Sequence, residues 1–169
     1  MYRKIEDFKS DWIDESQSTL KVFSYLTDES LNQKVSENGR SIGRLAWHIV
    51  LTIYEMLGKS GLDLKINMEE MDYAPVPKSV KMISDEYEKA SDEALRAVTK
   101  SWSDESLLED VNMYGENWKK GFILSSLIRH QTHHRAQITV LMRQAGLKVP
   151  GIYGPAYEEW ESMNMKPME

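Results

Sequence analysis

Three of the four histidines in this 169-residue chain lie within five consecutive positions: His130, His133 and His134. Imidazole is a common metal ligand, and residues four apart lie on the same face of an α-helix. His130 and His134 can therefore hold one metal ion between them. The fourth histidine, His48, lies in a separate segment. With it, the ligands would form a three-histidine site with open coordination positions, which favours chemistry over a purely structural role.

The hydrophobic pattern places His130 and His134 in the middle of an apolar face. At roughly 100° per residue, one arc of this segment holds Ile123, Leu127, His130, His134, Ile138, Leu141 and Ala145. Two neutral imidazoles at such positions need polar partners, and a metal ion would supply one for both. A hydrogen-bonded core pair is the alternative. His133 lies on the flank of this face and is the weaker candidate ligand.

His48 lies off the apolar stripe of its own segment. The stripe consists of Ile42, Leu45, Ala46, Ile49, Ile53 and Leu57. His48 falls on another side, shared with Arg44 and Glu55, where a ligand near a seam between helices is reasonable but not required by the periodicity. Glu55 is a candidate base or hydrogen-bond partner of a ligand, or a solvated surface charge. Gln137 could orient a ligand or a water, or simply pack.

Four long amphipathic segments predict the elements that position these residues. They run from Tyr2 to about Leu26, from an N-cap at Ser41 to near Gly58 or Gly61, from an N-cap at Ser79 through Val98, and from about Lys119 to Ala145, with Gly146 as terminator. A connector is expected at 63–77, and no alternating strand pattern of useful length is present. The prediction is an all-α four-helix bundle, a single domain over residues 1–169, with a tail from 150 that wraps the surface and contains one short helical turn.

Composition and missing motifs exclude several classes of protein. The chain has no cysteine, so a metal site must use imidazole, carboxylate or water. A net charge of −6 without a basic stripe argues against nucleic-acid binding. The N-terminal residues are too charged for a signal peptide, and the most apolar run, 45–57, is too short to span a membrane, so we expect a soluble cytoplasmic protein. Gln131 stands where the His-Glu-x-x-His metalloproteases carry their base, and the Glu-x-x-His motif of di-iron bundles is absent.

Two histidine segments give the chain its resemblance to a known family. They are Leu45-Ala-Trp-His-Ile49 and His130-Gln-Thr-His-His-Arg-Ala-Gln137. This pattern resembles the DinB/YfiT-like superfamily of bacterial metal-binding four-helix bundles, with Ala136 where many members carry glycine. The resemblance implies that His48, His130 and His134 bind one divalent ion, zinc or nickel, with water in the remaining positions.

The resemblance also implies a class of activity. Family members with assigned reactions include transferases and isomerases that use low-molecular-weight thiols. The leading hypothesis is therefore a metal-dependent enzyme, a thiol S-transferase or hydrolase-like, in which the ion activates a thiol or a water for attack on a small-molecule substrate. The rival hypothesis is a non-catalytic, stress-related metal-binding protein that dimerises, for which ten methionines and five tryptophans suit an adaptable interface. Homodimers are expected under either hypothesis.

Overall fold

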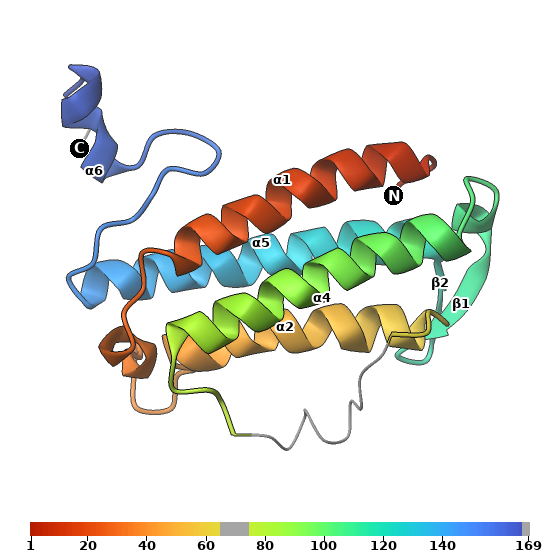
Figure 1. Ribbon diagram of the computed structural model, residues 1–169, viewed down its shortest axis with the longest axis horizontal. Helices are drawn as coiled ribbons and strands as arrows, with labels where there is room; N and C mark the ends of the chain where they lie inside the picture. Colours follow the sequence, from red (N-terminus) through yellow and green to blue (C-terminus); the bar gives the residue numbers. More distant parts are fainter. Residues whose placement is uncertain (65–74, 167–169) are drawn as a thin grey trace.

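The fold is a four-helix bundle, seen in a computed structural model that describes residues 1–64 and 75–166 (Figure 1). Its long helices are α1 (Ile5–Phe23), α2 (Ile42–Lys59), α4 (Val80–Ser101) and α5 (Lys120–Gln144). The predicted helices are confirmed, although α1 begins and ends about one turn inside the predicted bounds. Residues 65–74 of the predicted connector lie outside the described residues.

The arrangement of the helices brings α2 against α5. α2 contacts both α4 and α5, and α1 contacts the same two helices, so α1 and α2 occupy opposite corners of the bundle. Figure 1 shows that α1 and α5 run in one direction while α2 and α4 run in the other. α2 and α5 are therefore antiparallel neighbours, and the seam between them joins the two histidine segments.

α2 is the most completely buried of the long helices. Its buried side chains include the predicted stripe and also lie outside it, at Trp47, Val50, Leu51, Tyr54 and Met56. A helix buried on most sides leaves few positions for polar groups, because each one needs a partner. His48 is only half-buried, which places it where α2 meets both its neighbour and solvent.

Of the two predicted N-cap serines, only Ser41 makes a side-chain cap hydrogen bond. Ser41 caps α2 as predicted, with its Oγ accepting from the backbone N–H of Arg44 at 3.1 Å. Ser79 occupies the N-cap position of α4 but makes no side-chain cap bond. Instead, Oδ1 of Asp28 accepts from the N–H of Val80 at 2.7 Å. The cap of α4 is thus supplied by a residue distant in sequence, which periodicity does not reveal.

The structure adds a short hairpin that the sequence pattern did not indicate. β1 (Asp110–Met113) and β2 (Glu116–Lys119) form an antiparallel hairpin before α5, with Met113 opposite Glu116. The turn residues Tyr114 and Gly115 have φ values of 56° and 88°. Positive φ at both positions is typical of a tight two-residue hairpin turn. Most of the hairpin side chains are exposed or half-buried, so the sequence lacks the alternation that marks a strand.

The tail follows Gly146, whose φ of 73° ends α5 as predicted. The tail contains one short α-helix, α6 (Tyr157–Trp160), and one 3₁₀ turn, η3 (Glu161–Met163). Two other 3₁₀ turns, η1 (Glu29–Asn32) and η2 (Ser106–Leu108), lie earlier in the chain. The tail is tied to the bundle by Tyr153, whose hydroxyl donates to Glu15 of α1 at 2.6 Å. None of the described helices has the length and apolar character needed to cross a membrane.

Candidate metal centre

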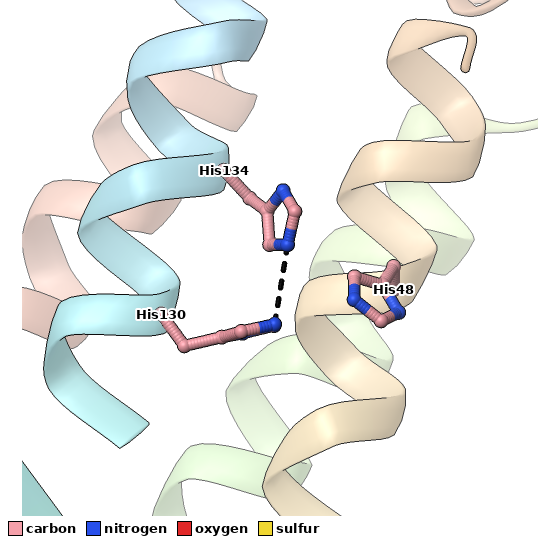
Figure 2. A group of neighbouring side chains, drawn as sticks. All are labelled: His48, His130 and His134. Atoms are coloured by element: carbon pink, nitrogen blue, oxygen red, sulfur yellow. Dashed lines mark hydrogen bonds between the residues drawn. The ribbon is translucent and has the colours of Figure 1, made fainter. Parts of the chain in front are cut away.

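His48, His130 and His134 meet on the seam between α2 and α5 (Figure 2). One ring nitrogen from each lies within 4.8 Å of those of the other two. The ring centroids are 4.4 Å apart for His130 and His134, and 5.0 Å and 4.8 Å from His48 to these two rings. Among the described residues, these three form a group that could hold a metal ion.

Gln137 fixes the orientation of the His134 ring. Its Oε1 lies 2.7 Å from Nδ1 of His134. An amide oxygen can only accept, so Nδ1 carries the hydrogen and Nε2 keeps its lone pair. The lone pair is on the side of the ring that faces His130 and His48. A hydrogen bond of this kind is what typically sets the tautomer of a metal-binding histidine.

Thr52 plays the same part for His130. The Thr52 hydroxyl donates to backbone carbonyls one turn back, at 2.9 Å to His48 and 3.1 Å to Ile49. When the hydroxyl donates to either carbonyl, its oxygen accepts from Nδ1 of His130, at 3.4 Å. Nε2 of His130 is then also free to donate a lone pair. Thr52 was not predicted to take part, although it lies four residues after His48 and so on the same face of α2.

The two Nε2 atoms face each other at 3.1 Å, the contact drawn as a dashed line in Figure 2. Two lone pairs at this distance repel unless a cation lies near both, or unless one ring changes tautomer and gives up its Nδ1 hydrogen bond. Tetrahedral zinc with bonds of about 2.0–2.1 Å places neighbouring ligand nitrogens roughly 3.4 Å apart. The pair on α5 is close to that spacing, so its donor set fits a divalent ion.

Electrostatics keeps the three imidazoles neutral. Burial, and then the neighbouring His130 and His134, lower the pKa of His48 to about 4. Burial, and then His134, lower the pKa of His130 to about 4. Burial also lowers the pKa of His134, against the opposing hydrogen bond to Gln137. Since only the neutral ring offers a lone pair, all three are in the ligand form at neutral pH.

Of the other candidate residues from the sequence, only Gln137 contacts the three-histidine group through a hydrogen bond, whereas His133 and Glu55 are not part of it. His133 is exposed and is not part of the group, although its ring lies 4.9 Å from that of His134. Glu55 is half-buried near the hairpin, where burial, and then the charge of Glu55 and its hydrogen bond, raise the pKa of Tyr114 to about 12. It is not among the grouped ligand atoms. Gln137 was expected either to orient a ligand or a water, or simply to pack, and its hydrogen bond to His134 supports the role of orienting a ligand.

The sequence profile of the DinB family matches residues 1–168. The chain belongs to the DinB family. It is 43% identical over 166 residues to the uncharacterized protein YrdA of Bacillus subtilis (strain 168), and the match covers 98% of each chain. The predicted resemblance is thereby confirmed. These findings are consistent with metal binding by the three histidines, and they assign no reaction.

Solved structures agree with the fold. The crystal structure of a DinB-like protein from Bacillus cereus ATCC 10987 matches this DinB-family chain with a TM-score of 0.84 and 43% identity, covering 90% of this chain and 100% of that one. YjoA, a DinB-like protein of Bacillus subtilis, matches with a TM-score of 0.67 and 14% identity, covering 86% and 96% of the two chains. The second likeness concerns the fold alone.

Proposed function

We propose that this DinB-family protein binds one divalent ion, zinc or nickel, through His48, His130 and His134, and is a metal-dependent enzyme. The observation that carries the proposal is the 3.1 Å approach of Nε2 of His130 to Nε2 of His134, with His48 beside them. Three protein ligands leave at least one coordination position for an exogenous group. A bound divalent ion lowers the pKa of a thiol or water in that position, so that the nucleophile forms near neutral pH.

The protein groups around the histidines favour a thiol as that nucleophile. The chain has no cysteine, so a thiol would come from a small cosubstrate. Within the described part of the chain, no carboxylate joins the three-histidine group to act as a base for water. An ordinary thiol has a pKa of about 8.5, whereas bulk water has one of about 15.7, so the thiol needs far less help to ionise. A thiol S-transferase is the first candidate activity, and hydrolysis by an activated water is the second.

The protein's own residues would have three tasks in such a reaction. Gln137 and Thr52 hold the two α5 imidazoles in the ligand tautomer. The half-buried setting of His48 and His130 keeps them neutral, so protons do not compete with the ion near neutral pH. The apolar core of α2 beneath them restricts access to the solvent-facing side of the seam.

A thiol-transfer assay tests the proposal. Zinc- or nickel-loaded protein is mixed with a panel of low-molecular-weight thiols and 1-chloro-2,4-dinitrobenzene, and the thioether is followed as a C–S bond replaces the C–Cl bond and chloride and a proton are released. We expect turnover in the wild type and in His133→Ala, and a fall to the uncatalysed rate in a folded His134→Ala. Ester hydrolysis is measured in parallel for the second candidate.

The rival function makes a different prediction for the same variants. A non-catalytic metal-binding interaction protein would show no turnover in either assay. Its His134→Ala variant would lose melting temperature or dimer stability together with the metal. Size-exclusion chromatography of loaded wild type and variant therefore accompanies the assays, and this combination of results would contradict the enzyme proposal.

A further inference from the structure

A pocket beside the three histidines has the chemistry to receive the body of a substrate. Its volume is about 380 Å³, within the range of small-molecule sites. The wall consists of Val35, Arg40, Leu45, His134, Gln137, Val140 and Leu141. His134 and Gln137 thus belong both to the candidate metal centre and to the pocket, so a molecule in the pocket lies against the centre.

The apolar part of the wall combines buried and exposed side chains. Leu45 and Leu141 are each only 4% exposed, whereas Val35 and Val140 are 65% and 55% exposed. Leu45 comes from α2 and Val140 and Leu141 from α5, so the pocket lies on the same seam as the histidines. An apolar group placed here would cover the two exposed valines, which is favourable because it removes apolar surface from water.

Arg40 supplies the charge in this wall. Among the described residues no carboxylate lies in salt-bridge range of its guanidinium, in contrast to Arg135, which pairs with an acid of α1. Its positive charge also contributes to the lowered pKa values of His48, His130 and His134, so it acts on the whole centre. A guanidinium that no carboxylate of the described residues pairs with is well suited to a carboxylate or another oxyanion, which it can bind through two parallel N–H donors.

We propose that the substrate acted on at this centre is a small molecule with an apolar body and an anionic group. The body lies between the valines and leucines of the pocket, and the anion pairs with Arg40. The reacting atom is then presented beside His134. This inference rests on the proposed function for what happens at the metal, whereas the pocket and Arg40 are expected to bind such a molecule with or without the ion.

Binding of a matched pair of probes tests the inference. 4-Phenylbutanoate and its neutral amide, 4-phenylbutanamide, are titrated into the full chain by NMR, once metal-free and once zinc-loaded. We expect metal-free wild type to bind the acid on the order of tenfold more tightly than the amide, because a charge-assisted hydrogen bond is stronger than a neutral one. Arg40→Gln should remove this preference and leave amide binding within about twofold.

Two further variants separate the pocket from its surroundings. Arg44→Gln changes a nearby exposed arginine that does not line the pocket, and it should keep the preference for the acid. Val140→Ser changes an exposed pocket residue and should weaken both probes by a similar factor. Equal binding of acid and amide by the wild type, no saturation by either probe in the millimolar range, or equal losses in Arg40→Gln and Arg44→Gln would overturn the inference.

The metal-loaded titration distinguishes this inference from the proposed function. If only zinc-loaded protein prefers the acid, and Arg40→Gln retains that preference, the ion holds the anion and the assignment to Arg40 is wrong while metal binding stands. If the chain takes up no metal but the metal-free protein still shows the Arg40-dependent preference, the pocket is confirmed and the proposed function fails.

Discussion

Two consecutive residues of α5, His134 and Arg135, face the two different seams that α5 forms with α2 and α1, and they lie in polar clusters of different kinds. Arg135 is 2% exposed and points to α1, where it donates to Oε2 of Glu15 at 2.6 Å and to Oγ1 of Thr19 at 3.1 Å. It also donates to the hydroxyl of Tyr153, which in turn donates to Glu15 at 2.6 Å. In this cluster protein donors meet protein acceptors.

The histidine cluster on the other seam brings ring nitrogens of like chemistry together. Nδ1 of His134 and Nδ1 of His130 contact Gln137 and Thr52, and the two Nε2 atoms approach each other at 3.1 Å. The comparison teaches that burial of polar groups does not by itself mark a functional site. A cluster of complementary donors and acceptors ties the α1–α5 seam and the tail together, whereas a cluster of converging ring nitrogens can also take a cation between them.

The largest expected effect comes from breaking the satisfied cluster. Arg135→Ala leaves the carboxylate of Glu15, whose side chain is 15% exposed, without its counter-ion. We expect a loss of about 3–5 kcal/mol in the free energy of unfolding of the metal-free protein, measured by urea denaturation. Arg129→Ala, an exposed change on the same helix, should cost about 0.5 kcal/mol or less. Similar losses in the two variants would contradict a structural role for the Arg135 cluster.

Binding of zinc to the three histidines should raise the free energy of unfolding by less than the loss expected in Arg135→Ala. Zinc at about a hundred times its dissociation constant should raise the free energy of unfolding by about 2.7 kcal/mol, because it binds the folded state. Thermal unfolding with and without zinc measures the shift. His133→Ala should show the full shift and His130→Ala none. A shift that survives in His130→Ala would place the ion elsewhere on the molecule.

Removing a partner of the ligands should have a smaller effect than removing a ligand. Gln137→Met takes away the acceptor of His134 without changing the three ligands, and should weaken zinc affinity by roughly tenfold to a hundredfold in a competition titration with a chelator. Thr52→Val should weaken it less, since the contact to His130 is long at 3.4 Å. Gln144→Met, an exposed change on α5, is the control. Unchanged affinity in Gln137→Met would show that its hydrogen bond has no role in binding.

The smallest expected effect is the pH dependence of the metal-free protein. The pKa values of His48 and His130 are about 4 in the folded state against an ordinary value of 6.5, so the unfolded chain binds more protons between these values. Stability is therefore lost as the pH falls from 6.5 towards 4. We expect on the order of 1 kcal/mol from this source, because half-buried rings can turn towards water when protonated.

A variant without the two rings isolates that contribution from the carboxylates that titrate in the same range. His48→Asn combined with His130→Asn should lose less stability than the wild type between pH 6.5 and pH 4, followed by urea denaturation at each pH. Curves of the same slope for the two proteins would mean that the rings are not held in a neutral state by the fold.

Local patterns in the sequence were sufficient for the helices and for the pair on α5. Period and cap residues predict four helices, and the spacing of His130 and His134 follows from one helix alone. The hairpin was missed because its side chains do not alternate, and its turn depends on a non-glycine residue, Tyr114, at positive φ. The cap of α4 was missed because Asp28 reaches it across the fold.

The rest of the candidate site depends on which helices are neighbours. The period of α2 leaves His48 off the apolar stripe, and only the packing of α2 against α5 brings it to the other two rings. The same packing turns Thr52 into a partner of His130 and makes Arg40 part of a pocket with Val140. Such contacts across a seam are set by tertiary structure, which single-helix arithmetic does not contain.

Metal content per chain shows whether the three histidines bind an ion. Tag-free wild type, His48→Ala, His130→Ala and His133→Ala are purified without chelator, reconstituted with zinc or nickel, dialysed and measured by elemental analysis. We predict about one ion per chain in the wild type and His133→Ala, and a loss of the ion in His48→Ala and His130→Ala. Retention of the ion in His48→Ala would remove His48 from the ligands. A wild type without metal after reconstitution would contradict the account, leaving the histidines as a hydrogen-bonded pair with His48 beside them.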